Sequence, residues 1–426
     1  MMLGKRTGRM AVILSCSMLV QGLFAAAPHV RAETGDLGLK VESAVLIDAA
    51  TGSVLYELKK DDPRPPASMA KMMTEYLVME QIESGKISWE DMVMTSKTAA
   101  DAIGSGQLMA EGETYNLRKV FELLSIYSGN DAAIALAEHI SGSQDEFAKL
   151  MNETANKIGL SDKAHFINAT GLDRKDMVEQ PSIEGETIMT AYDAALLARR
   201  IVTEHRQVLD YTKIPQKKFN DTDKEPMVNW NYMVEGNKDN VNLRKYAYEG
   251  LDGLKTGHTK IAGYNFTGTA ERDGMRLISV VMGAKSIDGR FVETRKLLDY
   301  GFNNFELKTV LVAKTEHPEI KTVHIPNAVK RDVPVLIGEG LEVVGKKGED
   351  QTEAIGYKLF EESKLAAPLK AGDPVGTVTV KYAGRDFEVP LIVTEDVEKA
   401  GWFKMFMRGI GDFFSNLFSG IVGLFN

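Results

Sequence analysis

Cysteine is almost absent from this sequence of 426 residues, in which Cys16 is the only one. A lone cysteine forms no intrachain disulfide, no four-cysteine zinc site and no C-x-x-C redox pair. The H-E-x-x-H motif of zinc peptidases is absent as well. These absences exclude thiol–disulfide exchange and indicate that any catalytic site is built from other side chains.

Basic residues are outnumbered, with 51 Lys and Arg against 60 Asp and Glu and a formal net charge of −9. Binding nucleic acid requires basic surface that neutralises phosphates, so this balance argues against nucleic acid as a main partner. The other fractions, 44% hydrophobic and 26% charged residues, are those of a globular protein. At roughly 150 residues per domain, the length predicts about two or three domains.

Long apolar runs are few, and the first of them lies near the N-terminus. Three basic residues precede an apolar run at 10–27, and small residues at 30–32 form a cleavage site before Glu33. This order predicts a secretory signal peptide at 1–32 that leaves with the lone cysteine. The alternative is an uncleaved membrane anchor, which the short run and its interruption by Gln21 disfavour.

A second apolar segment, 402–425, is rich in aromatic residues and is interrupted every three or four positions by polar ones. Such spacing places the polar residues on one face of a helix. The segment therefore predicts an amphipathic helix, within 397–426, that lies on a membrane surface rather than spanning it. The alternative is a helix that packs on its own domain.

The chain between these ends divides into two regions of different pattern. Residues 44–57 and 264–283 read as strands, while helical patterns dominate from about Ser68 to Arg200. Strands at the two ends of this region can pair in one sheet, with the helical segment inserted between them. This arrangement indicates one α/β domain at 33–306. Short apolar runs punctuated by Gly and Pro predict a small all-β domain at 307–396.

The first candidate motif is Ser68-Met69-Ala70-Lys71, which follows two prolines. Proline favours a helix start, and residues three apart share a helical face, so the Lys71 amine is expected beside the Ser68 hydroxyl. Burial in the apolar run that follows would depress the pKa of the lysine, and a neutral lysine can activate a serine nucleophile. The alternative is a helix-capping serine with a solvated lysine.

Two further motifs follow in the chain. Ser128-Gly129-Asn130 is a glycine break between helical segments, which either presents a hydroxyl and an amide to a cleft or is a simple turn with an Asn cap. Lys255-Thr256-Gly257 precedes the strand near Tyr264 and offers a cation, a hydroxyl and a residue without side chain along a strand edge. The three patterns S-x-x-K, S-x-N and K-T-G each occur once and in that order.

This ordered triple resembles the active-site serine penicillin-binding proteins and β-lactamases, and more closely the low-molecular-weight D-alanyl-D-alanine carboxypeptidases. The resemblance extends over essentially the whole chain, including Gly253–Thr259, Gly289-Arg290, the β-domain and the C-terminal helix. It implies an α/β (α+β) transpeptidase-like catalytic domain, with an antiparallel sheet and a helical subdomain, followed by the all-β domain and the helix.

The resemblance also implies residue roles. Ser68 would attack the carbonyl of the penultimate D-alanine, with Lys71 as general base. Ser128 would pass a proton to the departing D-alanine, and Asn130 would hold the substrate amide.

Lys255 would supply positive potential, next to Gly257 on the same strand. Thr256 and Arg290 would bind the terminal carboxylate, and the backbone N–H groups of the nucleophile and of His258 would form the oxyanion hole. No metal or other cofactor is implied.

The implied partners are the peptidoglycan stem pentapeptide, β-lactams as covalent inhibitors, and the outer face of the cytoplasmic membrane. A DD-endopeptidase would use the same machinery. A serine β-lactamase is a rival, although no Glu-x-x-Leu-Asn segment lies between Ser128 and Lys255. A non-catalytic β-lactam-binding or wall-binding protein would have no need of Lys71.

Overall fold

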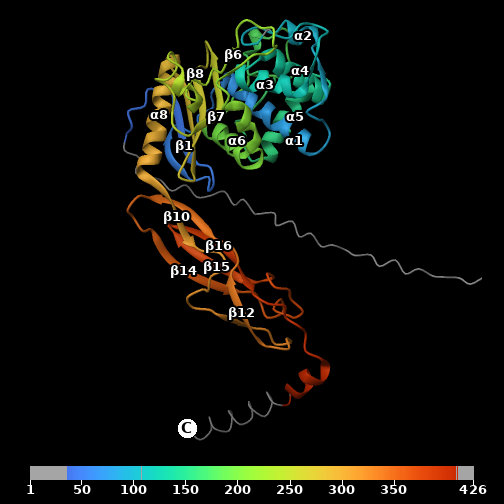
Figure 1. The fold of residues 1–426 in the computed structure, drawn as a ribbon, viewed down its shortest axis with the longest axis vertical. Helices are drawn as coiled ribbons and strands as arrows, with labels where there is room; N and C mark the ends of the chain where they lie inside the picture. Colours follow the sequence, from blue (N-terminus) through green and yellow to red (C-terminus); the bar gives the residue numbers. More distant parts are fainter. Residues whose placement is uncertain (1–35, 107, 409, 411–426) are drawn as a thin grey trace, which may run out of the picture.

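The computed structural model describes residues 36–106, 108–408 and 410, which form two bodies joined end to end (Figure 1). The N-terminal domain combines a sheet with helices, and the second body is built of strands and ends in a short helix. The predicted signal peptide at 1–32 lies outside the described residues. Of the predicted C-terminal helix, residues 402–408 are helical, and most of the remainder lies outside the described part of the chain.

The N-terminal domain is built on a five-stranded antiparallel sheet in which strands from the two ends of the domain pair. β1 pairs with β9 from Ser43–Met282 to Asp48–Leu277, which confirms the expected sheet closed across a helical insert. The order across the sheet is β2 (Val54–Leu58), β1 (Ser43–Asp48), β9 (Met275–Ala284), β8 (Gly263–Arg272) and β7 (Leu251–Thr259).

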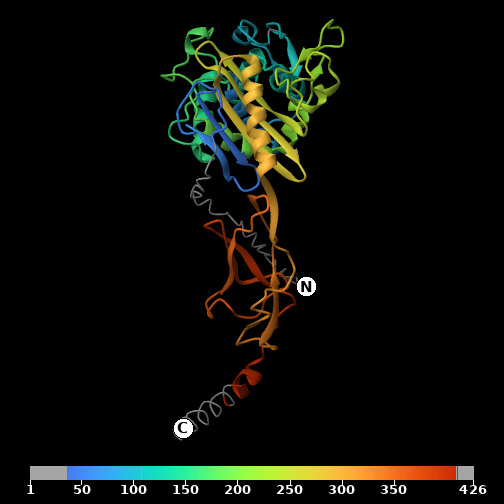
Figure 2. The same ribbon diagram turned by 90° about the vertical axis from the view of Figure 1, so that its left-hand side faces the viewer.

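Each face of this sheet is covered by helix. α8 (Ile287–Asn304) packs along one face, as Figure 2 shows, and the remaining helices cover the other. α8 begins directly after Ser286, whose hydroxyl accepts a hydrogen bond from Gly289 N at 2.9 Å and caps the helix.

The helical insert forms the second layer. Its α-helices are α1 (Lys71–Glu83), α2 (Lys97–Ala100), α3 (Leu117–Tyr127), α4 (Asn130–Ser141), α5 (Gln144–Lys157), α6 (Ala191–Glu204) and α7 (Leu209–Thr212). Its short strands and 3₁₀ turns are η1 (Ala67–Ala70), β3 (Met92–Met94), β4 (Thr114–Asn116), η2 (Arg174–Asp176), η3 (Arg206–Val208), β5 (Gln216–Lys217), β6 (Met227–Val228) and η4 (Glu235–Asp239). α1 contacts α3, α4, α5, α6 and β7 and is buried from Lys71 to Met79, including the polar side chains Lys71, Thr74 and Glu75.

The second body is an all-β domain with its own apolar core, as expected from the sequence. Its five-stranded sheet has the order β11 (Thr322–His324), β12 (Asp332–Ile337), β16 (Arg385–Val393), β15 (Pro374–Tyr382) and β14 (Thr352–Leu359), and a separate pair joins β10 (Phe305–Leu311) to β13 (Leu341–Lys346). β10 starts at the residue that caps α8, so the two domains meet without a linker. Arg385 Nη1 also donates to Ser53 Oγ at 2.6 Å across the seam.

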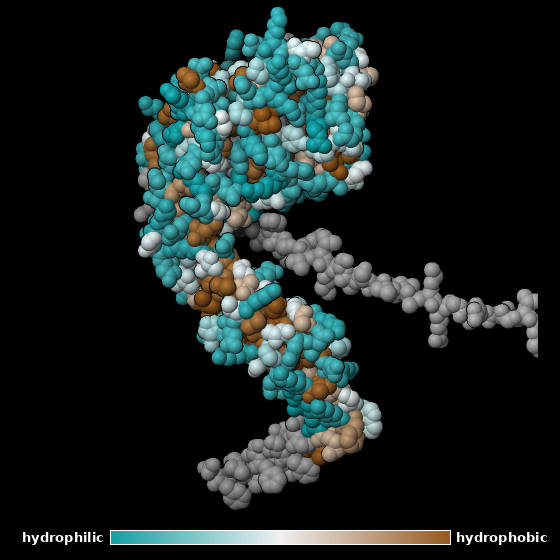
Figure 3. Space-filling view, viewed as in Figure 1, coloured by the Kyte–Doolittle hydropathy of each residue, from teal (hydrophilic) through white to brown (hydrophobic). Residues whose placement is uncertain are grey.

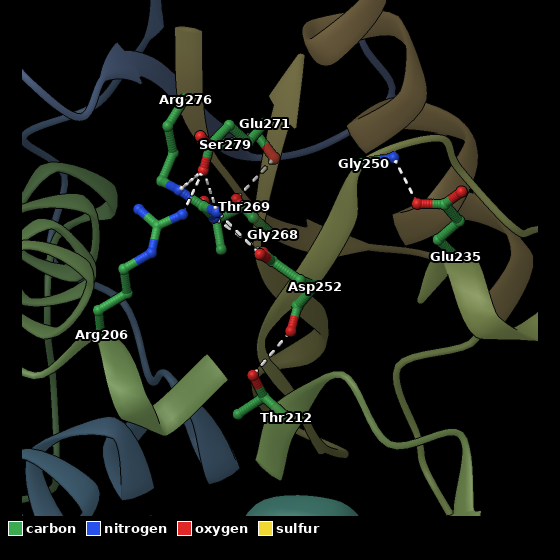
Figure 4. Close-up of polar contacts among 10 residues, drawn as sticks. All are labelled: Arg206, Thr212, Glu235, Gly250, Asp252, Gly268, Thr269, Glu271, Arg276 and Ser279. Atoms are coloured by element: carbon green, nitrogen blue, oxygen red, sulfur yellow. Dashed lines mark hydrogen bonds and ion pairs between the residues drawn. The ribbon is translucent and has the colours of Figure 1, made fainter. Parts of the chain in front are cut away.

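An ion-pair cluster fastens the exposed ends of β7, β8 and β9 (Figure 4). Arg276 is 7% exposed and donates from both terminal nitrogens to the two carboxylate oxygens of Asp252, each at 2.8 Å. The same guanidinium donates to Glu271 at 2.6 Å, and Arg206 donates to that carboxylate as well. Because the arginine is buried and bidentate, this cluster should stabilise the sheet more than a surface pair does.

Replacing Arg276 with methionine is expected to lower the free energy of unfolding by about 2–4 kcal/mol, because Asp252 loses its cation and Glu271 keeps only Arg206. Chemical denaturation measures the change. The matched control is Lys213→Met, which breaks the exposed pair with Asp210 and should cost less than about 1 kcal/mol. Equal losses for the two variants would contradict a special contribution from the buried guanidinium.

Candidate active site

Ser68 lies on the first turn of a continuous helical segment, as its sequence context predicts. The segment starts as η1, and Lys71 begins α1 directly after it. Ala67, just before the serine, has a φ of 51°, a left-handed value that non-glycine residues seldom adopt. A Cβ on Gly171 would lie 2.0 Å from the Ala67 carbonyl oxygen, so only glycine fits where this loop supports the strained turn.

The Lys71 amine is completely buried and has three oxygen neighbours. Its Nζ lies 3.0 Å from Ser68 Oγ, 2.7 Å from Asn130 Oδ1 and 2.8 Å from the Thr170 carbonyl oxygen. The local i,i+3 contact with Ser68 was predictable from the sequence. The other two contacts bridge 59 and 99 residues of chain.

Burial lowers the pKa of Lys71 well below the ordinary value for a lysine, because the charged amine loses its hydration. The positive charge of Lys255 lowers it further, and the carboxylates of Asp131 and Glu75 act in the opposite direction. The expectation that burial depresses this pKa is therefore supported, and a neighbouring cation contributes as well.

Ser128 and Asn130 lie at the break between α3 and α4. Ser128 ends α3 with a left-handed φ of 64°, and Asn130 is the first residue of α4. The Asn130 side chain accepts from the Lys71 amine and donates through Nδ2 to the Ile103 carbonyl at 2.6 Å. The break is thus not a simple turn, because it holds Asn130 against the lysine.

Lys255 and Thr256 come from β7, the strand at the edge of the sheet. Lys255 is 2% exposed, and its amine donates to Ser128 Oγ at 2.7 Å and to the Thr256 carbonyl at 3.3 Å. Gly257 faces the start of η1, where a Cβ would lie 2.3 Å from the Pro66 carbonyl oxygen. Glycine at this position therefore lets the strand edge approach the Ser68 turn.

His258 lies further along β7, and Arg290 lies on α8. The His258 ring stacks on Tyr264 with 4.0 Å between ring centroids, and its Nδ1 lies 2.9 Å from the Gly263 carbonyl. Arg290 is 3% exposed, and burial lowers the pKa of its guanidinium to about 10. Within the described part of the chain, its Nε has no hydrogen-bond partner.

The structure brings the three motifs together through two direct lysine contacts, Lys71 with Asn130 and Lys255 with Ser128. Sequence reasoning assigned no role to the Thr170 carbonyl, which carries no residue-type signal because it is a backbone atom. It also passed over Glu75, a charged residue in an otherwise apolar helix. The described residues include no group of three or more His, Cys, Asp and Glu side chains that could hold a metal ion.

Comparison with known proteins identifies the family. Residues 30–286 match the family model described as D-alanyl-D-alanine carboxypeptidase. The chain belongs to this family. Residues 305–399 match the penicillin-binding protein 5 C-terminal domain. The protein is thus a serine-type D-alanyl-D-alanine carboxypeptidase, a hydrolase of the penicillin-binding group that functions on the cell wall.

Individual relatives match most of this carboxypeptidase. It is 32% identical over 382 residues to D-alanyl-D-alanine carboxypeptidase DacF of Bacillus subtilis, covering 89% of this chain and 91% of the relative. It is 36% identical to DacC of Escherichia coli over 369 residues, which is 84% of each chain. Among solved structures, penicillin-binding protein 5 of Haemophilus influenzae has a TM-score of 0.68 at 30% identity, covering 85% of this chain and 98% of that one.

Proposed function

We propose that Ser68 is the nucleophile and Lys71 the general base of this carboxypeptidase. The observation that carries the proposal is the set of partners around the Lys71 amine. Asn130 Oδ1 and the Thr170 carbonyl oxygen can only accept hydrogen bonds, so each takes one hydrogen of the amine. Ser68 Oγ is the one neighbour of the three that can donate.

A neutral lysine has two N–H groups and one lone pair. Because two acceptors hold the two hydrogens, the lone pair of Lys71 faces the Ser68 hydroxyl at 3.0 Å. This arrangement orients the amine as a base, and the lowered pKa favours its neutral form. A protonated lysine in the same position would instead donate to the serine and leave it unactivated.

The acylation step then runs as follows. Ser68 Oγ attacks the carbonyl carbon of the penultimate D-alanine while its proton passes to Lys71 Nζ. The carbonyl oxygen takes up the negative charge and is stabilised by the backbone N–H groups of Ser68 and His258. As the intermediate collapses, the C–N bond breaks, and Ser128 delivers a proton to the leaving D-alanine nitrogen. Ser128 receives in its place the proton that Lys71 took from Ser68, so Lys71 is neutral again. Lys255 supports that transfer through its 2.7 Å contact with Ser128 Oγ.

Hydrolysis completes the cycle. Water attacks the ester carbonyl, its proton passes to the neutral Lys71, and the Ser68 oxygen leaves and regains a proton. The products are the shortened peptide and the enzyme in its starting form. Every group used belongs to a side chain or backbone of this chain, and the overall reaction consumes one water.

The substrate is held at the strand edge. We propose that Thr256 and Arg290 bind its terminal carboxylate, since a buried guanidinium with an unpartnered Nε suits a carboxylate ligand. Asn130 holds the substrate amide, and Gly257 keeps β7 close to the nucleophile. The preferred substrate is then a peptidoglycan stem pentapeptide that ends in D-alanyl-D-alanine.

Covalent inhibition by β-lactams follows from the same machinery. The structure of penicillin-binding protein D2 from Listeria monocytogenes, 33% identical with a TM-score of 0.54, is described as ampicillin-bound. We propose that a β-lactam acylates Ser68 here, because its strained amide resembles the D-alanyl-D-alanine end of the substrate. Inhibition follows because the acyl group is then released only slowly from Ser68.

The activity is tested with diacetyl-lysyl-D-alanyl-D-alanine and the purified chain lacking residues 1–32. Release of one free D-alanine per peptide is expected. A cross-linked muropeptide assayed in parallel tests the endopeptidase alternative, and a chromogenic cephalosporin tests the β-lactamase alternative. Turnover of the muropeptide or the cephalosporin, without release of D-alanine from the peptide, would overturn the proposal that the substrate is a peptide ending in D-alanyl-D-alanine.

We further propose that the protein is secreted through residues 1–32 and held on the outer face of the cytoplasmic membrane by 402–425. No helix in the described part of the chain is long and apolar enough to cross a membrane. Lys404 and Arg408 donate to backbone carbonyls of the β-domain, so the basic face of the helix points to the protein. Trp402 and Phe406 on the same turns are 80% and 60% exposed, which leaves an apolar surface free for lipid.

This free surface lies at the end of the β-domain opposite the N-terminal domain (Figure 3). Replacing Trp402, Phe403 and Phe406 with serine should weaken flotation of the protein with phospholipid vesicles, because three of the apolar side chains that enter the acyl region are lost. Carboxypeptidase activity should stay unchanged. The matched control replaces Tyr357 and Phe360, exposed aromatics elsewhere on the β-domain, with serine. A triple variant that floats like the parent protein would place the anchor elsewhere.

A further inference from the structure

Glu75 is a buried carboxylate that the proposed reaction does not use. It lies on α1, four residues after Lys71, so the two side chains share one face of the helix. The side chain is 0% exposed and accepts from no backbone N–H group in the described part of the chain, and the Ser125 hydroxyl on α3 is the polar group that acts on its carboxylate. An isolated charge in such a place is very unfavourable unless a cation lies nearby.

Two buried basic side chains act electrostatically on this carboxylate. Lys71 lies one turn back on the same helix, and Lys255 lies on β7, which packs against α1. Arg290 on α8 is also buried and acts on Lys255 in turn. Positive charge on these buried groups is favourable only when a negative charge lies nearby.

The other buried carboxylates near α1 are already occupied. Asp131 on α4 accepts from the backbone N–H groups of Leu108 and Met109. Asp193 on α6 accepts from Ser161 and Thr190, which caps the helix. Asp131 also acts on Lys71, but of these three carboxylates Glu75 is the one that acts on both Lys71 and Lys255 and that accepts from no backbone N–H group.

We propose that Glu75 is a positioning residue for the reaction proposed above: its buried carboxylate is the counter-charge that keeps a proton on Lys255 while Lys71 is neutral. Without it, both lysines would share a dry site that also contains Arg290, and Lys255 would give up its proton. Lys255 without its proton would no longer supply positive potential to Ser128 and to the substrate carboxylate.

The electrostatics of the site agree with this arrangement. Burial raises the pKa of Glu75. This rise is opposed by Lys255, by the Ser125 hydroxyl on α3 and by Lys71. Burial lowers the pKa of Lys255, Glu75 opposes the decrease, and Arg290 adds to it. Each group thus favours the charged form of the other.

The test is the pH dependence of acylation by a fluorescent penicillin, measured on Glu75→Gln. Acylation requires neutral Lys71 and protonated Lys255, so the plot of rate against pH should be bell-shaped. Its acidic limb, where the rate rises, reports the pKa of Lys71, and its alkaline limb, where the rate falls, reports the pKa of Lys255. Removing a negative charge lowers the pKa of both lysines, so both limbs should move to lower pH by about one unit. A purely structural role would lower the rate without moving either limb.

Three further variants complete the design. Glu75→Asp keeps the charge and should leave both limbs within about 0.3 units of the parent. Glu80→Gln makes the same chemical change on the same helix at a partly exposed ion pair with Lys157, and should not shift them. Ser125→Ala weakens the carboxylate form of Glu75 and should move both limbs in the same direction by less, which keeps the test valid if Glu75→Gln does not fold.

The outcomes separate this inference from the proposed function. If the parent protein neither binds penicillin nor releases D-alanine, the proposed function is wrong. If the parent is active and the pH profile of Glu75→Gln coincides with that of the parent, the counter-charge role alone is wrong. If Glu75→Gln does not fold, the same conclusion follows from a Ser125→Ala profile that coincides with that of the parent.

Discussion

Replacing Ser68 with alanine is expected to reduce kcat/KM for D-alanine release by at least about 10³-fold, because the acyl-enzyme can no longer form. The fold should be unaffected, since the change removes one oxygen from a side chain whose neighbours keep their positions. Intact-mass measurement after incubation with penicillin should show the drug-sized increment on the parent chain and none on the variant.

The control for this substitution is Ser84→Ala at the other end of the same helical segment. The Ser84 hydroxyl is exposed and donates only to the Gln81 carbonyl, at 3.1 Å, among its neighbours in the described structure. This variant should retain the activity and the penicillin adduct of the parent. A Ser68→Ala protein that still gains a penicillin adduct would move the nucleophile to another residue, of which Ser128 is the first to test.

Replacing Lys71 with arginine should reduce acylation by about 10²–10⁴-fold at neutral pH. A guanidinium keeps the positive charge and the length of the side chain, but it is not deprotonated in proteins and cannot accept the Ser68 proton. The parent rate should rise with pH as Lys71 loses its proton, in a range well below the ordinary lysine pKa because burial and Lys255 lower it. The arginine variant should have no such rise.

Lys97→Arg serves as the matched control, because Lys97 is exposed and pairs with Asp101 one helical turn away. It should behave as the parent at every pH. An arginine variant at position 71 that keeps the acidic limb of the parent would show that another group sets this limb. The base would then have to be sought elsewhere in the site.

Local sequence patterns were sufficient to predict the main helices and strands of the fold. The apolar strand segments of β1, β8 and β9 and the helical pattern that includes α1 are strong local signals, and each forms the predicted type of element. Helix ends were less predictable because they depend on single capping contacts, as at Ser286. The route of β10 directly out of α8 also has no local signal, because it follows from pairing with β13 about 35 residues later.

By itself, the sequence determined which side chains are available for chemistry and that Ser68 and Lys71 are neighbours, since helix geometry brings residues three apart together. Only the tertiary structure decided what surrounds them. The Lys71 amine meets Asn130 and Thr170, and Lys255 meets Ser128 across 127 residues of chain. Burial and cation–cation repulsion act through space, so the lowered pKa of Lys71 and the position of Glu75 arise only when the chain is folded.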